Sequence, residues 1–170
     1  MSTIDAPPPV VPVLSGPAPH ILVVRAPYYA QVVDGLRDGT DQMLQAAGAS
    51  WETVDVAGAL ELAAVLRFAV AGNTAYDGYV VLGCVVRGET DHYDFVCREA
   101  MAGLTHMALV HSLPIGAALL TVDTLEQALA RAGAGSHNKG AEAAAACLRQ
   151  IAVKRALVDG LPLAAFGASE

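Results

Sequence analysis

The sequence between positions 78 and 86 reads Gly78-Tyr79-Val80-Val81-Leu82-Gly83-Cys84-Val85-Val86. A nearly continuous apolar run of this length, rich in β-branched residues, is typical of a strand buried on both faces of a parallel sheet. Three similar runs predict further strands at positions 21–24, 51–56 and 114–122. The alternation of these runs with longer helical patterns predicts an α/β protein.

The helical patterns follow the predicted strands in order and have apolar residues spaced at three and four positions. They cover approximately positions 31–47, 60–71, 93–111, 124–132 and 138–157. Asn138 is expected to cap the last of these helices. Right-handed crossovers between parallel strands place helices on both sheet faces, so we expect a four-stranded parallel sheet in a three-layer α/β/α sandwich.

The size and charge of the chain restrict its partners. With 170 residues it has the length of one domain. A formal net charge of −7 argues against a general binder of phosphate backbones, so nucleic acid is not an expected partner. The 54% of apolar residues is high for a soluble monomer and favours burial of surface between copies of the chain.

The domain is expected to span residues 20–158. Residues 1–19 contain six prolines and predict a flexible, extended arm, and residues 159–170 predict a flexible tail. The uncharged stretch 100–122 is interrupted at Ser112-Leu113-Pro114, which favours a buried helix and strand over a membrane span. The N-terminus lacks the features of a signal peptide.

The three cysteines Cys84, Cys97 and Cys147 are widely spaced. An odd number without a Cys-x-x-Cys pair predicts neither a disulfide framework nor a zinc site. Reduced thiols in a cytoplasmic protein are therefore the expectation.

Polar residues follow each predicted strand, at positions 25–29, 57–61, 87–92 and 121–123. Ligands of parallel α/β sheets bind beyond the carboxyl ends of the strands, so these four segments predict one composite pocket.

Each candidate side chain in these segments has an alternative interpretation. His92, beside Glu89, Asp91 and Asp94, is either a proton-transfer group favoured in its protonated form or an ordinary surface histidine. Arg131 is either a phosphate ligand near a glycine-rich turn or a helix C-terminal arginine.

The same ambiguity applies to the remaining candidates. For Arg87 a surface charge is favoured over an anion ligand. Glu61 could accept hydrogen bonds from a heterocycle or complement a helix N-terminus. Tyr28 could stack on a planar ring or belong to an apolar rim.

Several motifs together resemble the 6,7-dimethyl-8-ribityllumazine synthase family. The stretch Leu82-Gly83-Cys84-Val85-Val86-Arg87-Gly88-Glu89-Thr90-Asp91-His92-Tyr93-Asp94 is similar to its signature loop. Similar motifs occur, in the right order, at positions 58–61, 121–128, 131–133 and 138–143. The resemblance covers about residues 20–157 and is specific, because the separate motifs keep a consistent spacing.

The resemblance implies a flavodoxin-like fold and an enzyme of riboflavin biosynthesis. The family condenses 5-amino-6-(D-ribitylamino)uracil with 3,4-dihydroxy-2-butanone 4-phosphate and needs no metal or redox cofactor. By this resemblance the catalytic residues are His92, for proton transfer, and Arg131, for holding the phosphate. The implied substrate-binding residues are Tyr28, Ala59, Leu60, Glu61, Cys84, Val85, Val86, Glu89, Thr90, Ala117 and Lys139.

Some positions depart from the family pattern. Tyr29 lies close to the expected ring site without an assigned role, Ala57 replaces a common proline, and Ala117 replaces a phenylalanine. Tyr29 and Ala117 leave open a catalytically weak paralogue that binds flavin or lumazine. A separate alternative is a protein that acts mainly as a shell scaffold. Family members are pentamers with active sites between subunits, and some form shells of 60 subunits. The short turn between Arg131 and Lys139 favours the shell.

Overall fold

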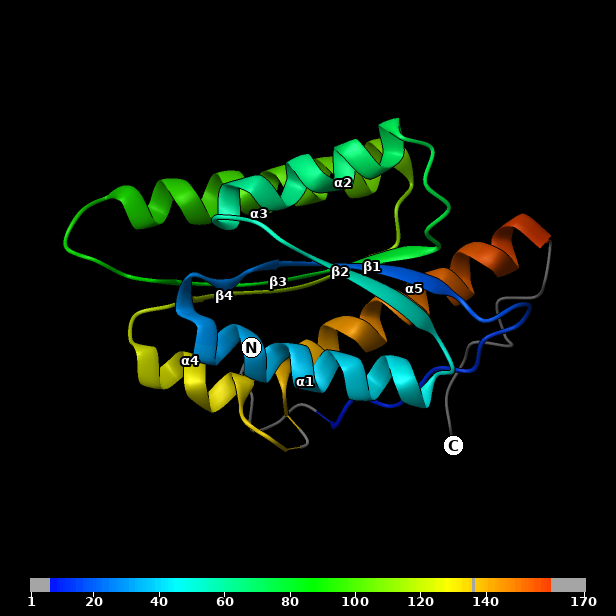
Figure 1. Ribbon diagram of the computed structural model, residues 1–170, viewed down its shortest axis with the longest axis horizontal. Helices are drawn as coiled ribbons and strands as arrows, with labels where there is room; N and C mark the ends of the chain where they lie inside the picture. The colour runs from blue at the N-terminus through cyan, green and yellow to red at the C-terminus, as the bar shows by residue number, and fades with distance from the viewer. Residues whose placement is uncertain (1–6, 136, 160–170) are drawn as a thin grey trace.

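A computed structural model describes residues 7–135 and 137–159 of the chain (Figure 1). It has four parallel strands in the order β2-β1-β3-β4. The strands are β1 (His20–Ala26), β2 (Ser50–Asp55), β3 (Gly78–Val86) and β4 (Ile115–Val122). The α-helices are α1 (Ala30–Ala46), α2 (Leu62–Ala71), α3 (His92–His111), α4 (Leu125–Ala132) and α5 (Lys139–Asp159). Two short 3₁₀ helices, η1 (Pro27–Tyr29) and η2 (Ala59–Glu61), precede α1 and α2.

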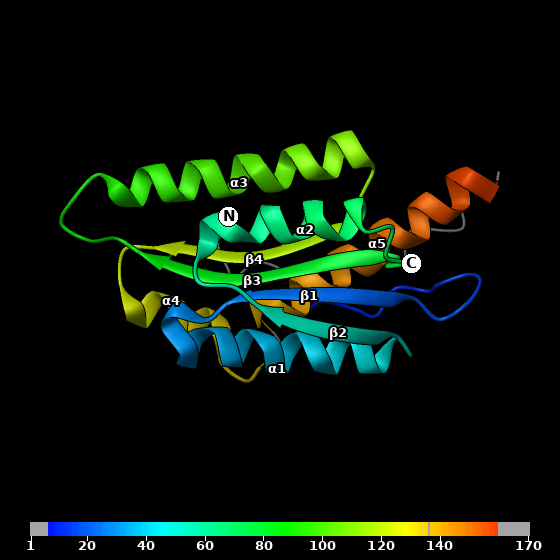
Figure 2. The same cartoon turned by 45° about the horizontal axis from the view of Figure 1, so that its top comes forward.

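The predicted fold class is confirmed, and helices cover both faces of the sheet (Figure 2). Helices α1, α4 and α5 lie on one face, where Val23, Leu36, Leu82 and Leu148 belong to one core cluster. Helices α2 and α3 lie on the other, where Val24, Leu66, Val81 and Leu104 belong to a second cluster. Successive side chains along a strand point to opposite faces of the sheet, so they pack into two separate cores.

The prediction that every strand is buried on both faces is wrong for β2. Strand β3 is buried along most of its length, whereas β2 exposes Ser50, Glu52, Thr53 and Asp55. The reason is topological, because β2 lies at the edge of the sheet and, among the described residues, pairs with β1 alone.

Strand β4 forms the opposite edge and also exposes residues, at Ala117 and Thr121. Near its start the edge is covered by the side-chain amide of Gln150 in α5. This amide accepts a hydrogen bond from the Ile115 N–H at 3.2 Å and donates one to the Ile115 carbonyl at 2.7 Å. Gln150 thus imitates one residue of a neighbouring strand.

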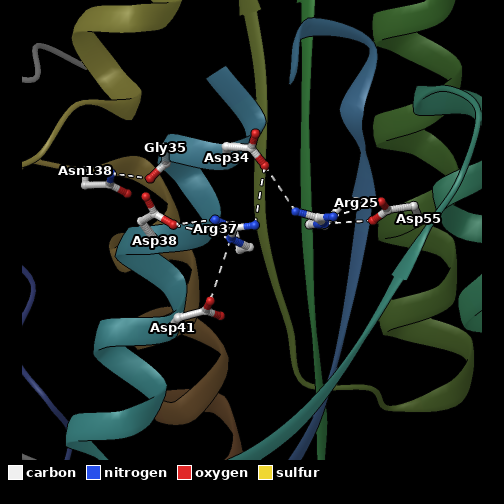
Figure 3. Close-up of polar contacts among 8 residues, drawn as sticks. All are labelled: Arg25, Asp34, Gly35, Arg37, Asp38, Asp41, Asp55 and Asn138. Carbon is white, nitrogen blue, oxygen red and sulfur yellow. Dashed lines mark hydrogen bonds and ion pairs between the residues drawn. The ribbon is translucent and has the colours of Figure 1, made fainter. Parts of the chain in front are cut away.

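Helix α5 lies unusually close to α1, and Asn138 joins the two at the start of α5. Its carboxamide nitrogen donates to the carbonyls of Gly35, Ala132 and Gly133 (the Gly35 contact appears in Figure 3), and its oxygen accepts from the main chain of Gly140 and Ala141. The predicted cap is confirmed. Asn138 is 5% exposed, so these bonds are shielded from water.

The proline-rich segment before β1 contacts the helical layer. The guanidinium of Arg155 in α5 donates to the carbonyls of Ser15 and Pro17, at 3.0 and 2.8 Å. The arm and the tail are predicted to be flexible. Residues 1–6 of the arm and 160–170 of the tail lie outside the described residues. Across the described part of the chain, no helix is both long and apolar enough to cross a bilayer.

The close approach of α1 and α5 yields a stability prediction. A Cβ added at Gly140 would overlap the carbonyl oxygen of Leu36, a main-chain atom that cannot move aside. We expect Gly140→Ala to lower the free energy of unfolding by about 1–3 kcal/mol, the usual cost of overpacking, in urea denaturation. Gly88→Ala is the matched control, because an added Cβ there meets no atom within 4 Å. Equal stability of the two variants would contradict the expectation.

Candidate active site

A pocket of about 320 Å³ opens at the carboxyl ends of three strands. The segment after β1 contributes Tyr28 and Tyr29, and the segment after β2 contributes residues 58–61. The end of β3 contributes residues 84–86, and α3 contributes His92 and Val96. The expected composite pocket thus forms from three of the four strand ends, while residues 121–123 at the end of β4 do not line it.

The end of β3 is left open on one side. Pairing of β1 with β3 ends at Ala26 and Gly83, whereas β4 pairs with β3 as far as Val86. Residues 84–86 therefore extend beyond β1, and their main chain has no strand partner on that side. Peptide groups in this position can hydrogen-bond a planar heterocycle.

Two tyrosines form the wall of the pocket that follows β1. Their rings pack edge to face, with centroids 5.1 Å apart and an angle of 66°. Tyr29 packs against the core cluster below it, whereas Tyr28 is 77% exposed. The Tyr28 ring therefore has a free face on which a planar ligand can stack.

His92 is the first residue of α3 rather than a loop residue. It is exposed and lines the pocket together with Val96, one helical turn further on. The preceding residues 88–91 are exposed at the amino end of this helix, where the helix dipole favours an anion. An exposed histidine and a helix amino end that suits an anion are thus adjacent.

Glu61 ends the 3₁₀ helix η2 and lines the pocket with Ala59 and Leu60. Its carboxylate lies against Gly58, where an added Cβ would be 3.2 Å from the Glu61 Oε2 atom. The small residue at position 58 thus leaves room for the carboxylate at the rim.

Cys84 contributes main chain rather than a reactive thiol to the pocket. It is 5% exposed, and burial raises the pKa of its thiol to about 11. The thiol is therefore neutral near pH 7 and a poor nucleophile. All three cysteines are free thiols, in agreement with the prediction of no disulfide.

Five of the sequence-predicted site residues do not line this pocket in the single chain. They are Glu89, Thr90, Ala117, Arg131 and Lys139. The Arg131 guanidinium donates to the Gln127 carbonyl of its own helix, at 2.8 Å. The Lys139 ammonium pairs with the Glu142 carboxylate. Both residues belong to helices on the α1 face of the sheet, away from α2 and α3.

The contacts of Arg87 are those of a surface charge, the interpretation favoured from the sequence. Its side chain is 45% exposed and pairs with Asp94 and Asp123. These hydrogen bonds, with Asp94 the larger influence, raise the pKa of the guanidinium. The Cζ atom of the Arg87 guanidinium also lies 4.1 Å from the centre of the Tyr93 ring. The cluster holds the start of α3 against the end of β4.

Tyr29 and Val96 line the pocket without having been assigned a role from the sequence. The spacing of Val96 from His92 could have identified it, because residues four apart lie on one helix face. Tyr29 adjoins Tyr28, but its contact with the core is not visible in the sequence pattern.

Comparisons with known proteins show the family to which the chain belongs. Residues 18–155 match the family model described as 6,7-dimethyl-8-ribityllumazine synthase. Proteins of that name from Bartonella tribocorum and Agrobacterium fabrum are each 43% identical to this chain, over 83% and 82% of it and 93% and 97% of their own lengths. One from Methylorubrum extorquens is 43% identical over 89% of both chains. The chain belongs to the 6,7-dimethyl-8-ribityllumazine synthase family.

Proposed function

We propose that this chain catalyses the condensation of 5-amino-6-(D-ribitylamino)uracil with 3,4-dihydroxy-2-butanone 4-phosphate. The products are 6,7-dimethyl-8-ribityllumazine, phosphate and two waters. The observation that carries the proposal is the pocket that joins Tyr28, residues 58–61, the open end of β3 and His92 in a member of this family.

The pyrimidine substrate fits the apolar and main-chain part of the pocket. Tyr28 offers a ring face for stacking. The peptide groups at residues 84–86 supply donors and acceptors for the ring, and Ala59, Leu60 and Glu61 line the opposite wall for the ribityl chain. These contacts hold the amine in a fixed orientation.

The chemical steps require little from the protein beyond orientation and proton transfer. The amine attacks the ketone to form a Schiff base, phosphate is eliminated, and the ring closes. His92 is the proton-transfer group in the pocket. Holding the two substrates in register supplies much of the remaining rate enhancement.

The phosphate is assigned to Glu89, Thr90, Arg131 and Lys139. Glu89 and Thr90 precede α3 beside His92, and backbone N–H groups with a hydroxyl suit an anion there. Arg131 and Lys139 lie outside the pocket of their own chain. We therefore infer that a neighbouring copy supplies Arg131, Lys139 and Ala117, and that the enzyme is a homo-oligomer, a pentamer or a shell of pentamers.

Exposed apolar side chains support burial of surface between copies. On α3 they are Phe95, Met101, Leu109 and Val110. Such a concentration on one helix is typical of an association surface. The free thiols support a cytoplasmic location for the enzyme.

The proposal is tested by mixing the purified protein with both substrates and following lumazine fluorescence and phosphate release together. Equal amounts of lumazine and phosphate are the expected result. Binding of lumazine or riboflavin without turnover would instead favour the paralogue interpretation. The names of the relatives favour the enzyme over that alternative.

His92→Ala is expected to lower kcat by about 10- to 100-fold, at or below the roughly 100-fold lower end of what one general acid–base group contributes. The effect is limited because orientation supplies much of the rate. The measurement is the steady-state rate, with the size of the assembly followed by light scattering and expected to be unchanged. His106→Ala is the control, an exposed histidine of the same helix outside the pocket. An unchanged kcat in His92→Ala would refute its assignment.

Arg131→Ala is expected to raise the KM for the butanone phosphate by about 10- to 100-fold, because a charged hydrogen-bond donor to phosphate contributes about 1.5–3 kcal/mol. The KM for the pyrimidine is expected to change little. Arg98→Ala, an exposed arginine paired with its neighbour Glu99, is the control. Equal rises in both KM values would argue against a phosphate ligand.

A further inference from the structure

The side chain of Arg25 links three elements at the pocket end of the sheet (Figure 3). Its Nε and Nη2 atoms donate to the two oxygens of Asp55 at the end of β2, at 2.7 and 2.8 Å. Its Nη1 atom donates to Asp34 in α1, at 3.3 Å. The main-chain carbonyl of Arg25 also accepts a hydrogen bond from Val56 N–H, at 2.8 Å. Arg25 therefore holds β1, β2 and α1 together.

The residues that make these contacts lie next to the two chain segments that line one side of the pocket. Tyr28 and Tyr29 lie in the chain between Arg25 and Asp34. The other lining segment begins at Gly58, three residues after Asp55. Each segment is short and is fixed at an end that Arg25 holds, so the separation of the two segments depends on this arginine.

Arg25 itself does not line the pocket. It occupies the same face of β1 as Ile21 and Val23, which belong to the core under α1. Its side chain is 13% exposed, whereas those of Asp34 and Asp55 are 52% and 48% exposed. A planar guanidinium in such a setting forms a fixed, two-pronged bond to a carboxylate that a lysine cannot reproduce.

We propose that Arg25 is a positioning residue for the pyrimidine subsite, acting through its forked pair with Asp55 and its bond to Asp34. This inference rests on the proposed function, since it concerns the pocket assigned to that substrate. The fork sets the distance between Tyr28 and residues 58–61, and hence the width of the slot that receives the ring. The phosphate end of the site depends on other segments and is not affected.

The test compares Arg25→Met, Arg25→Lys, Asp55→Asn and the Arg25→Met/Asp55→Asn double variant with the wild type. The dissociation constant of the pyrimidine substrate alone is measured by fluorescence titration, and both KM values are measured in the synthase assay. We expect the pyrimidine dissociation constant and KM to rise about tenfold in each single variant, the scale of one lost charge-assisted interaction. The KM for the butanone phosphate is expected to stay the same.

Two features make the result specific. Arg25→Met and Asp55→Asn break the same link between Arg25 and Asp55. The pyrimidine dissociation constant of the double variant is therefore expected to be no higher than that of whichever of these two single variants binds the pyrimidine less tightly. Arg37→Met is the matched control, since Arg37 also contacts Asp34 but all of its ion pairs lie within α1, with Asp34, Asp38 and Asp41 (Figure 3). Folding is checked by thermal unfolding, and it is expected to persist because Asp34 and Asp55 remain accessible to water.

The possible outcomes separate this inference from the proposed function. Pyrimidine binding that is unchanged in Arg25→Met, or weakened equally in Arg37→Met, overturns the positioning role. Full recovery in Arg25→Lys overturns the role of the fork. A wild-type protein that binds the pyrimidine but forms no lumazine counts against the proposed synthase activity alone, and the binding titrations then still decide the role of Arg25.

Discussion

The contact of α5 with α1 is the constraint on which the rest of the structure depends. At Gly39 and Gly140 the two helices are too close for any larger side chain, since an added Cβ would meet Asn138 or the main chain of Leu36. Asn138 satisfies carbonyls of α1 and α4 and amides of α5 with one buried side chain. Small residues and one polar group thus fix three helices as a single layer.

This rigid layer gives the sheet one fully packed face and leaves the functional features to the other side and to the strand ends. The α1 face holds the larger buried cluster, whereas α2 and α3 cover β4 so incompletely that Ala117 and Thr121 stay exposed. The pocket lies at the strand ends, with walls of Tyr28, residues 58–61 and His92. The segments that line the pocket are thus supported by a closely packed helical layer.

Most of the fold could be predicted from the sequence. The run from Gly78 to Val86 is confirmed as β3 at both ends, because a central strand is buried on both faces and its composition reflects this. Strand β2 was located within one residue, but its exposure was missed, because the order of strands in a sheet is not encoded in any one segment.

The candidate site could be predicted only in part. His92, Glu61 and the end of β3 meet at the pocket, because the carboxyl ends of parallel strands share one edge of the sheet. The role proposed for Arg25 could not be foreseen, since its partner Asp55 is adjacent only through strand pairing. Arg131 and Lys139 stay predictions, because a single chain does not bring them to the pocket.

The packing of α1 against α5 also has a consequence for folding during synthesis on the ribosome. Helix α1 is synthesised well before α5, which is the last of the described helices. The apolar face that α1 and the sheet present to α5 stays uncovered until residues beyond position 139 have emerged. The core of this domain is therefore completed only after α5 has been synthesised, and until then the nascent chain exposes an apolar surface that is prone to aggregation.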